Sequence, residues 1–198
     1  MFKELQACLG RPVPANSRAM SFNAITLIKG RTPVRLSETV RAAFGALAGV
    51  IATGLIARLM LGGGASWTPL LVAPIGASAV LAFAVPASPL AQPRAVIGGN
   101  LVAALIGVSC ALLIPQPALA AGVAVAAAIL AMSVLGCLHP PGGAVALGAA
   151  LAGPQGVSAF GEVLAPIAVC SVLLVAAATL FAKLSGRSYP HRVAPPVN

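Results

Sequence analysis

The sequence predicts an all-α, polytopic membrane protein with about six transmembrane segments. Of its 198 residues, 59% are hydrophobic and 8% are charged, whereas soluble domains carry about 25% charged residues. Between Arg41 and Lys183 the only charged side chains are those of Arg58, Arg94 and Glu162. The apolar stretches between prolines and glycines are each close to the roughly 20 residues that cross a bilayer. This composition excludes a soluble globular domain and a disordered chain.

Three segments are expected in the first half of the chain. The first covers about Thr39 to Leu61 and ends at a run of three glycines. The second covers about Thr68 to Val85, with Pro69 and Pro74 in its first half. A proline-rich connection follows, and the third segment covers about Ala95 to Ile114. Each stretch ends where glycine or proline disfavours continuation of a helix.

The second half begins after the tight turn Pro115-Gln116-Pro117. As one straight helix, the apolar run from Ala118 to Ala152 would be about 52 Å long, against a hydrocarbon core of about 30 Å. The run must therefore break, and proline and glycine favour the break at Pro140-Pro141-Gly142-Gly143. The last segment covers about Glu162 to Lys183.

A weak internal repeat relates the two halves. The sequence from Pro74 to Leu81 aligns with that from Pro140 to Leu147, with proline, glycine and leucine at matching positions. Each half then holds a span, a segment that begins with Pro and Gly, and a second span. Because three is an odd number, the second half would be inverted relative to the first, as in many transporters. We therefore predict a 3+3 inverted repeat with halves at about 37–115 and 116–184, and with Pro/Gly-broken second and fifth segments.

The charges flank the apolar block and predict its orientation. Residues 1–36 form a basic N-terminal segment and residues 185–198 a polar tail, so the positive-inside rule places both termini in the cytoplasm of a protein of the inner (plasma) membrane. Six crossings also place Arg94 on the cytoplasmic side. The competing layout has four full spans and two re-entrant half-helices, and it places Arg94 outside. Because the bilayer accounts for the flanking charge, no nucleic-acid partner is expected.

The two breaks predict a small binding site. A proline at the first helical position costs little, and the backbone N–H groups and dipole of a helix start attract an anion without a fixed cation. Glycines at the start would let a small ligand approach the backbone. The alternative is that these residues only kink two helices. The candidate ligand-binding residues are Gly76, Ala77, Ser78, His139, Pro140, Pro141, Gly142, Gly143 and Ala144.

Four polar residues each have a structural and a functional interpretation. Arg94 is either an interfacial anchor or a funnel that draws anions to the site. Asn100 either bonds a neighbouring helix or lines the path. Glu162 stabilises a helix start, pairs with Arg94, or carries a coupling proton. His139 either caps a neighbouring helix, or gates or contacts the substrate, or is the other candidate proton carrier, because the reference pKa of histidine is about 6.5.

No catalytic or metal-binding set is visible in the sequence. The chain has no Asp, and its carboxylates are those of Glu4, Glu38 and Glu162, so paired-acid chemistry is not available within one chain. A P-loop motif is absent, His139 has no neighbouring metal ligands, and the four cysteines form no C-x-x-C pattern. We therefore expect no enzyme activity, no metal and no cofactor.

Four motifs in order resemble the HPP family of integral membrane proteins. The run from Leu138 to Ala144 reads LHPPGGA and resembles the signature that names the family. The runs from Pro74 to Leu81, from Ser88 to Gly99 and from Arg187 to Pro190 resemble its second-segment motif, its most recognisable run and its closing Arg-x-Tyr-Pro. The likeness covers roughly Arg35 to Pro190.

The resemblance implies a function and a topology. Family members in plastids and cyanobacteria are associated with nitrite transport, which implies a small monovalent anion. The family is often described with four spans, against the six that the residues predict here. Two positions depart mildly from the family pattern: Gly143, where members commonly have Ala, and Ala95, where they commonly have Asn.

Together these observations predict a membrane transporter or channel for a small inorganic anion, nitrite first. A six-span chain of this size needs further helices to enclose a transport path, so we expect a homo-oligomer, most simply a two-fold dimer. One alternative is a membrane scaffold or sensor that transports nothing and would tolerate bulky residues at Gly142 and Gly143. Another is a membrane-embedded enzyme, which would hold a metal or cofactor when purified.

Overall fold

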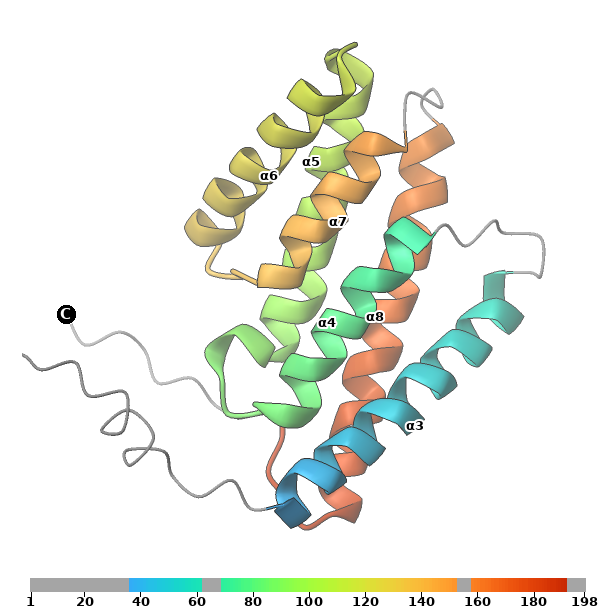
Figure 1. Ribbon diagram of the computed structural model, residues 1–198, viewed down its shortest axis with the longest axis vertical. Helices are drawn as coiled ribbons and strands as arrows, with labels where there is room; N and C mark the ends of the chain where they lie inside the picture. Colours follow the sequence, from blue (N-terminus) through green and yellow to red (C-terminus); the bar gives the residue numbers. More distant parts are fainter. Residues whose placement is uncertain (1–35, 62–68, 153–157, 192–198) are drawn as a thin grey trace, which may run out of the picture. The chain divides into compact units, whose positions relative to one another are not determined.

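A computed structural model describes residues 36–61, 69–152 and 158–191, and every regular element in these ranges is helical, which confirms the all-α prediction. Of the segments expected at 1–36 and 185–198, residues 1–35 and 192–198 lie outside the described residues, as do the runs 62–68 and 153–157. A 3₁₀ turn, η1 (Pro89–Ala91), and a π turn, η2 (Arg94–Gly98), lead into the third helix. The six helices are α3 (Leu36–Leu61), α4 (Pro69–Ala84), α5 (Gly99–Leu113), α6 (Pro117–Val134), α7 (Pro140–Leu151) and α8 (Ser158–Leu184) (Figure 1).

The six helices are of two lengths when α5 is counted together with the π turn η2 that leads into it. Four are long and apolar enough to cross a membrane, at Leu36–Met60, Arg94–Leu113, Pro117–Val134 and Phe160–Leu184. Helices α4 and α7 have 16 and 12 residues, or about 24 and 18 Å, and are shorter than the hydrocarbon core of about 30 Å. The order is therefore long, short, long in each half of the chain, and the short helices are the ones that contain the Pro/Gly motifs.

The two short helices begin differently. Helix α7 begins at Pro140, at the predicted break. Helix α4 begins at Pro69 and has Pro74 inside it, so Gly76, Ala77 and Ser78 do not form the helix start that the repeat suggested. The reason is that Pro69 already occupies the first helical position, where its missing N–H costs little.

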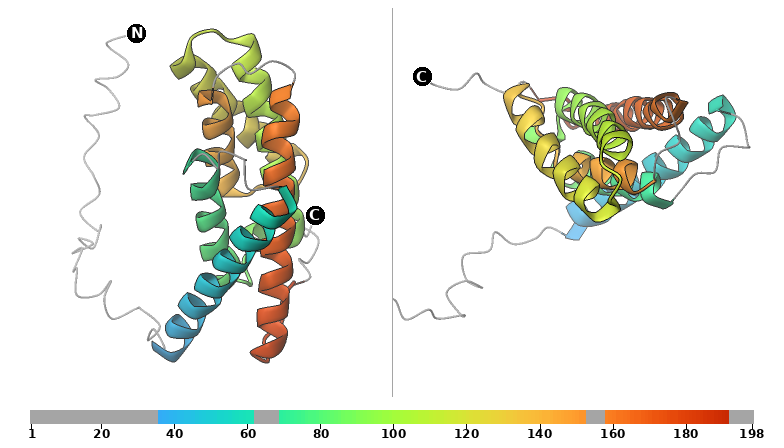
Figure 2. Two further views of the ribbon diagram at one scale, coloured as in Figure 1. Left: turned by 90° about the vertical axis from the view of Figure 1, so that its right-hand side faces the viewer. Right: turned by 90° about the horizontal axis from the view of Figure 1, so that it is seen from above.

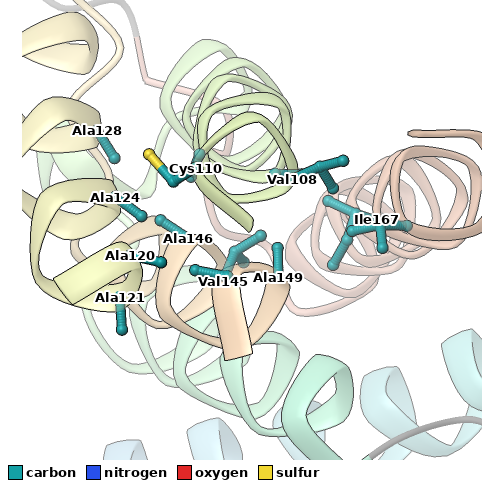
Figure 3. Packing of buried hydrophobic residues seen from close by; sticks show 14 of the residues in the cluster. Val108, Cys110, Ala120, Ala121, Ala124, Ala128, Val145, Ala146, Ala149 and Ile167 are labelled. Carbon is teal, nitrogen blue, oxygen red and sulfur yellow. The ribbon is translucent and has the colours of Figure 1, made fainter. Parts of the chain in front are cut away.

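Small side chains fill the contact among α5, α6 and α7. Buried alanines and Cys110 meet where the three helices pack, and Val108 on α5 faces Ile167 on α8 (Figure 3). A Cβ on Gly107 would lie 2.5 Å from the carbonyl oxygen of Ala146 and 2.7 Å from the Cβ of Ala149. The backbones of α5 and α7 therefore approach as closely as glycine permits, which is how helices gain packing energy in lipid.

A second core joins α3, α4 and α8, which lie side by side in Figures 1 and 2. It contains the buried ring of Phe83, which packs edge to face with the partly buried ring of Phe181, with centroids 5.6 Å apart. Gly45 and Gly49 on α3 make room for these rings, because a Cβ at either glycine would lie less than 3 Å from a ring carbon. The described helices thus form two three-helix groups, α3/α4/α8 and α5/α6/α7.

Two hydrogen bonds connect segments that are far apart in the sequence and lie near helix ends. The hydroxyl of Tyr189, beyond α8, donates to the carbonyl of Ala91 in the connection after α4, at 2.8 Å. Arg94, at the start of η2, donates to the carbonyl of Leu135 at the end of α6, at 2.7 Å. The connection after α4 therefore contacts the tail after α8, and the approach to α5 contacts the end of α6.

Candidate functional site

His139 is the centre of the polar residues inside the bundle. Its side chain is completely buried. One ring nitrogen, Nδ1, lies 2.8 Å from the carbonyl oxygen of Leu90 in η1, and the other, Nε2, lies 2.8 Å from the hydroxyl of Ser78 in α4. That hydroxyl also lies 2.9 Å from the carbonyl oxygen of Pro74. One imidazole thus joins α4, the connection before α5 and the start of α7.

The local sequence fixes the position of this ring. His139 is the residue before α7 and has an extended backbone, with φ −138° and ψ 107°, as the following proline requires. Gly99 lies directly behind it, because a Cβ there would be 2.6 Å from the Cβ of His139. The first turn of α5 therefore needs glycine so that the histidine can pass beside it.

The start of α7 has fewer free donors than a helix start usually offers. Pro140 and Pro141 have no backbone N–H, and the N–H of Gly142 donates to the carbonyl of His139 at 2.8 Å. The first three residues of α7 therefore offer no free backbone N–H to a ligand. Backbone donors at these positions cannot hold an anion in the way that the sequence suggested. What remains at this point is the positive end of the helix dipole and the imidazole itself.

The other candidate residues of the two short helices differ in exposure. Ser78, Pro141 and Gly142 are buried, whereas Ala77, Pro140 and Ala144 are exposed. Gly76 and Gly143 have open space where a Cβ would stand, whereas one at Gly142 would lie 3.0 Å from the sulfur of Met132. The structure thus brings Ser78 and His139 together, and it leaves small residues on exposed faces of the same two helices.

The remaining candidates lie apart from the histidine contacts. Asn100 is completely buried and donates to the hydroxyl of Ser171 on α8 at 3.1 Å, while its carbonyl oxygen has no partner. Arg94 is exposed and bonds Leu135, as described above. Glu162 is exposed near the start of α8, just beyond its first turn.

Sequence reasoning missed three participants. The Leu90 carbonyl is a backbone acceptor and leaves no signature in the sequence. Gly99 stands in the pair Gly98-Gly99, whose close approach to another segment was a readable signal. Ser171 is one of two serines in the apolar helix α8, and only the fold shows that it bonds Asn100.

Comparison with known proteins agrees with this architecture. Two proteins of Dictyostelium discoideum, each named only as a transmembrane protein, are both 35% identical to the chain, over 128 and 125 residues. These matches cover 62% and 61% of this chain but only 41% and 44% of the relatives, so the chain matches less than half of their length. No solved structure matches the chain. The family described as "HPP, transmembrane region" matches residues 31–190, and the chain therefore belongs to the HPP family of transmembrane proteins.

Proposed function

We propose that this protein is a membrane transporter or channel for a small inorganic anion, with nitrite as the first candidate. The observation that carries the proposal is the buried contact between Ser78 and His139, which joins the two short helices inside the bundle. Ionisable groups inside a membrane domain are costly and are usually retained for function. The proposal assigns the protein no reaction chemistry.

The helix contacts support an inverted repeat, the arrangement of many transporters. Exchanging α3, α4 and α5 for α6, α7 and α8 converts the contact α3–α4 into α6–α7, α3–α8 into α5–α6, and α4–α8 into α5–α7. The contacts α4–α7 and α5–α8 convert into themselves. The same exchange converts one buried core, α3/α4/α8, into the other, α5/α6/α7. His139 and Ser78 then meet at the contact that the two repeats share.

The charges favour an anion over a cation. Cation paths are commonly lined by carboxylates, and within the described helices the carboxylates are Glu38 and Glu162, at the ends of α3 and α8. No group of metal-binding side chains occurs among the described residues. At the junction of α4 and α7, a protonated His139 and the positive end of the α7 dipole both attract negative charge. Gly76, Ala77, Gly143 and Ala144 would leave room beside them.

The proposed topology has six crossings, with both termini and Arg94 on the cytoplasmic side of an inner membrane. Its support is the hydrogen bond from Tyr189 to Ala91, because re-entrant short helices would separate the connection after α4 from the tail after α8. In this arrangement α4 and α7, which are shorter than the hydrocarbon core, need residues beyond their ends to complete the crossing. Because His139 is covered on all sides, an ion reaches it only when α4 and α7 move apart. We further propose that the protein forms a homodimer, in which the second copy helps to enclose the transport path.

Anion uptake into proteoliposomes tests the proposal. Nitrite is compared with nitrate, formate and chloride at two pH values, using the wild-type chain and His139→Gln, which keeps hydrogen-bonding groups but carries no charge. We expect nitrite flux in the wild type and at least a tenfold loss in His139→Gln. Ser133→Ala is the matched control, since Ser133 is exposed and its hydroxyl bonds only the Ile129 carbonyl of its own helix.

A second candidate function has its own supporting observation. Both nitrogens of His139 already have protein partners, which suits a scaffold or sensor whose histidine only joins helices. Folded, oriented wild-type protein that moves none of the four anions would overturn the transport proposal and favour this role. Nitrite flux that persists unchanged in folded His139→Gln would retain transport but remove His139 from the path.

A further inference from the structure

The hydroxyl of Ser78 has one proton and two acceptors within reach. Its oxygen lies 2.8 Å from Nε2 of His139 and 2.9 Å from the carbonyl oxygen of Pro74. A hydroxyl donates one hydrogen bond, so it serves only one of these acceptors at a time. The protonation state of the histidine decides which one it serves.

The Leu90 carbonyl fixes the tautomer. A carbonyl oxygen only accepts, and it lies 2.8 Å from Nδ1, so Nδ1 carries a hydrogen in every state of this network. In the neutral histidine, Nε2 is therefore an acceptor, and the Ser78 hydroxyl must donate to it. The Pro74 carbonyl then keeps only the backbone N–H that the helix supplies.

We propose that Ser78 and His139 form a proton-binding site that takes up one proton without moving any heavy atom. The added proton bonds to the lone pair of Nε2, and the new N–H donates to the Ser78 oxygen. The hydroxyl hydrogen of Ser78 turns from Nε2 to the Pro74 carbonyl, and no covalent bond breaks. Every donor in the chain from Leu90 to Pro74 is then paired.

Among the described residues, no charged side chain is hydrogen-bonded to Ser78 or His139. The bonded partners are the Ser78 hydroxyl and the carbonyls of Leu90 and Pro74. The ring also lies beside Gly99 on α5, whose other neighbours are the sulfur of Met132 and the backbone carbonyl of Cys137. The exposed guanidinium of Arg94 is engaged by Leu135. A proton bound here is therefore not offset by a carboxylate, and an accompanying anion would neutralise it.

Protonation changes the strength of the contact between the short helices. Hydrogen bonds from a charged donor are roughly twice as strong as neutral ones, so the protonated histidine holds α4 to α7 more firmly. Loss of the proton weakens this contact and eases the separation that ion release requires. The role in transport rests on the proposed function, whereas proton binding itself does not.

Nitrogen NMR of the full chain, labelled with ¹⁵N-histidine and titrated without any anion substrate, tests the inference. The chain has two histidines, so in the His191→Asn variant all histidine signals come from His139. We expect a neutral form with hydrogen on Nδ1, and one protonation step at Nε2 as the pH falls. In Ser78→Ala the ratio of protonated to neutral ring at a given pH should fall about tenfold, because a charged hydrogen bond is lost. Ser78→Thr, which keeps the hydroxyl, and Ser133→Ala should titrate like the wild type.

Three results would overturn the inference: a neutral ring with hydrogen on Nε2, no protonation across the pH range in which the chain stays folded, or a Ser78→Ala titration identical to that of the wild type. None of them depends on flux, so each is distinguishable from failure of the transport proposal. Conversely, proton uptake with the expected Ser78 dependence would stand even if no tested anion were transported.

Discussion

Tyr189 and Ala91 are almost a hundred residues apart in the sequence, and the hydroxyl of the first donates a 2.8 Å hydrogen bond to the carbonyl of the second. The neighbouring residue Gln92 strengthens this connection, because its amide nitrogen donates to the carbonyls of Pro86 and Ser88 while its oxygen accepts from the backbone of His191. The tail thus braces the connection whose Leu90 carbonyl holds the ring of His139.

Removal of the tyrosine hydroxyl should loosen this brace. In Tyr189→Phe the buried carbonyl of Ala91 loses its donor, at a cost of about 1 kcal/mol in the free energy of unfolding. The change is measured as a lower midpoint of thermal unfolding in detergent. The neighbouring Ser188→Ala is the control, since Ser188 is exposed. Equal midpoints for the two variants would show that the bond contributes nothing.

The same tyrosine predicts a loss of stability at alkaline pH. Burial raises the pKa of Tyr189 to about 12, against about 10 in an unfolded chain. The folded chain holds the phenol proton more tightly, so this contribution is complete below about pH 10 and declines as the pH rises toward about 12. Because the chain has one tyrosine, its ionisation can be followed by ultraviolet absorbance. Tyr189→Phe should lose less stability than the wild type across this window, and parallel curves would contradict the assignment.

Two glycines should respond in opposite directions to the same substitution. Gly107→Ala places a methyl group 2.5 Å from the carbonyl oxygen of Ala146, so α5 and α7 must separate, at a cost of about 1–3 kcal/mol. Gly122 on α6 has open space where a Cβ would stand. Gly122→Ala should therefore be neutral or stabilising, because alanine favours the helix by up to about 1 kcal/mol relative to glycine. Thermal unfolding of both variants in detergent checks the pair. A Gly107→Ala variant as stable as the wild type would show that the contact between α5 and α7 is looser.

The start of a helix could be predicted from the local sequence where proline determines the backbone conformation. The start of α7 at Pro140 and the turn before α6 at Pro117 follow from proline alone. The start of α4 did not, since Pro69 and Pro74 both suit a first turn and the aligned motif favoured Pro74. Nothing in the local sequence distinguishes the two prolines.

The site was predictable only in part, for a similar reason. A histidine in an apolar run is visible in the sequence, and so is the Pro-Pro-Gly-Gly break. Its partners are a serine 61 residues away and a backbone carbonyl 49 residues away, and neither distance can be read from periodicity. The loss of free N–H groups at the start of α7 was readable, because two prolines occupy its first two positions.

Cysteine labelling would decide between six crossings and the layout with re-entrant short helices. The background chain lacks its native cysteines, and single cysteines are placed at Ala87, Ala118 and Ser188, all of which are exposed. A membrane-impermeant maleimide is added to sealed, oriented vesicles. With six crossings, Ala87→Cys reacts from the same side as Ser188→Cys, because the connection after α4 bonds the tail after α8, and Ala118→Cys reacts from the opposite side. With four spans and two re-entrant helices, Ala87→Cys and Ser188→Cys react from opposite sides. Ala118→Cys then reacts from the same side as Ser188→Cys.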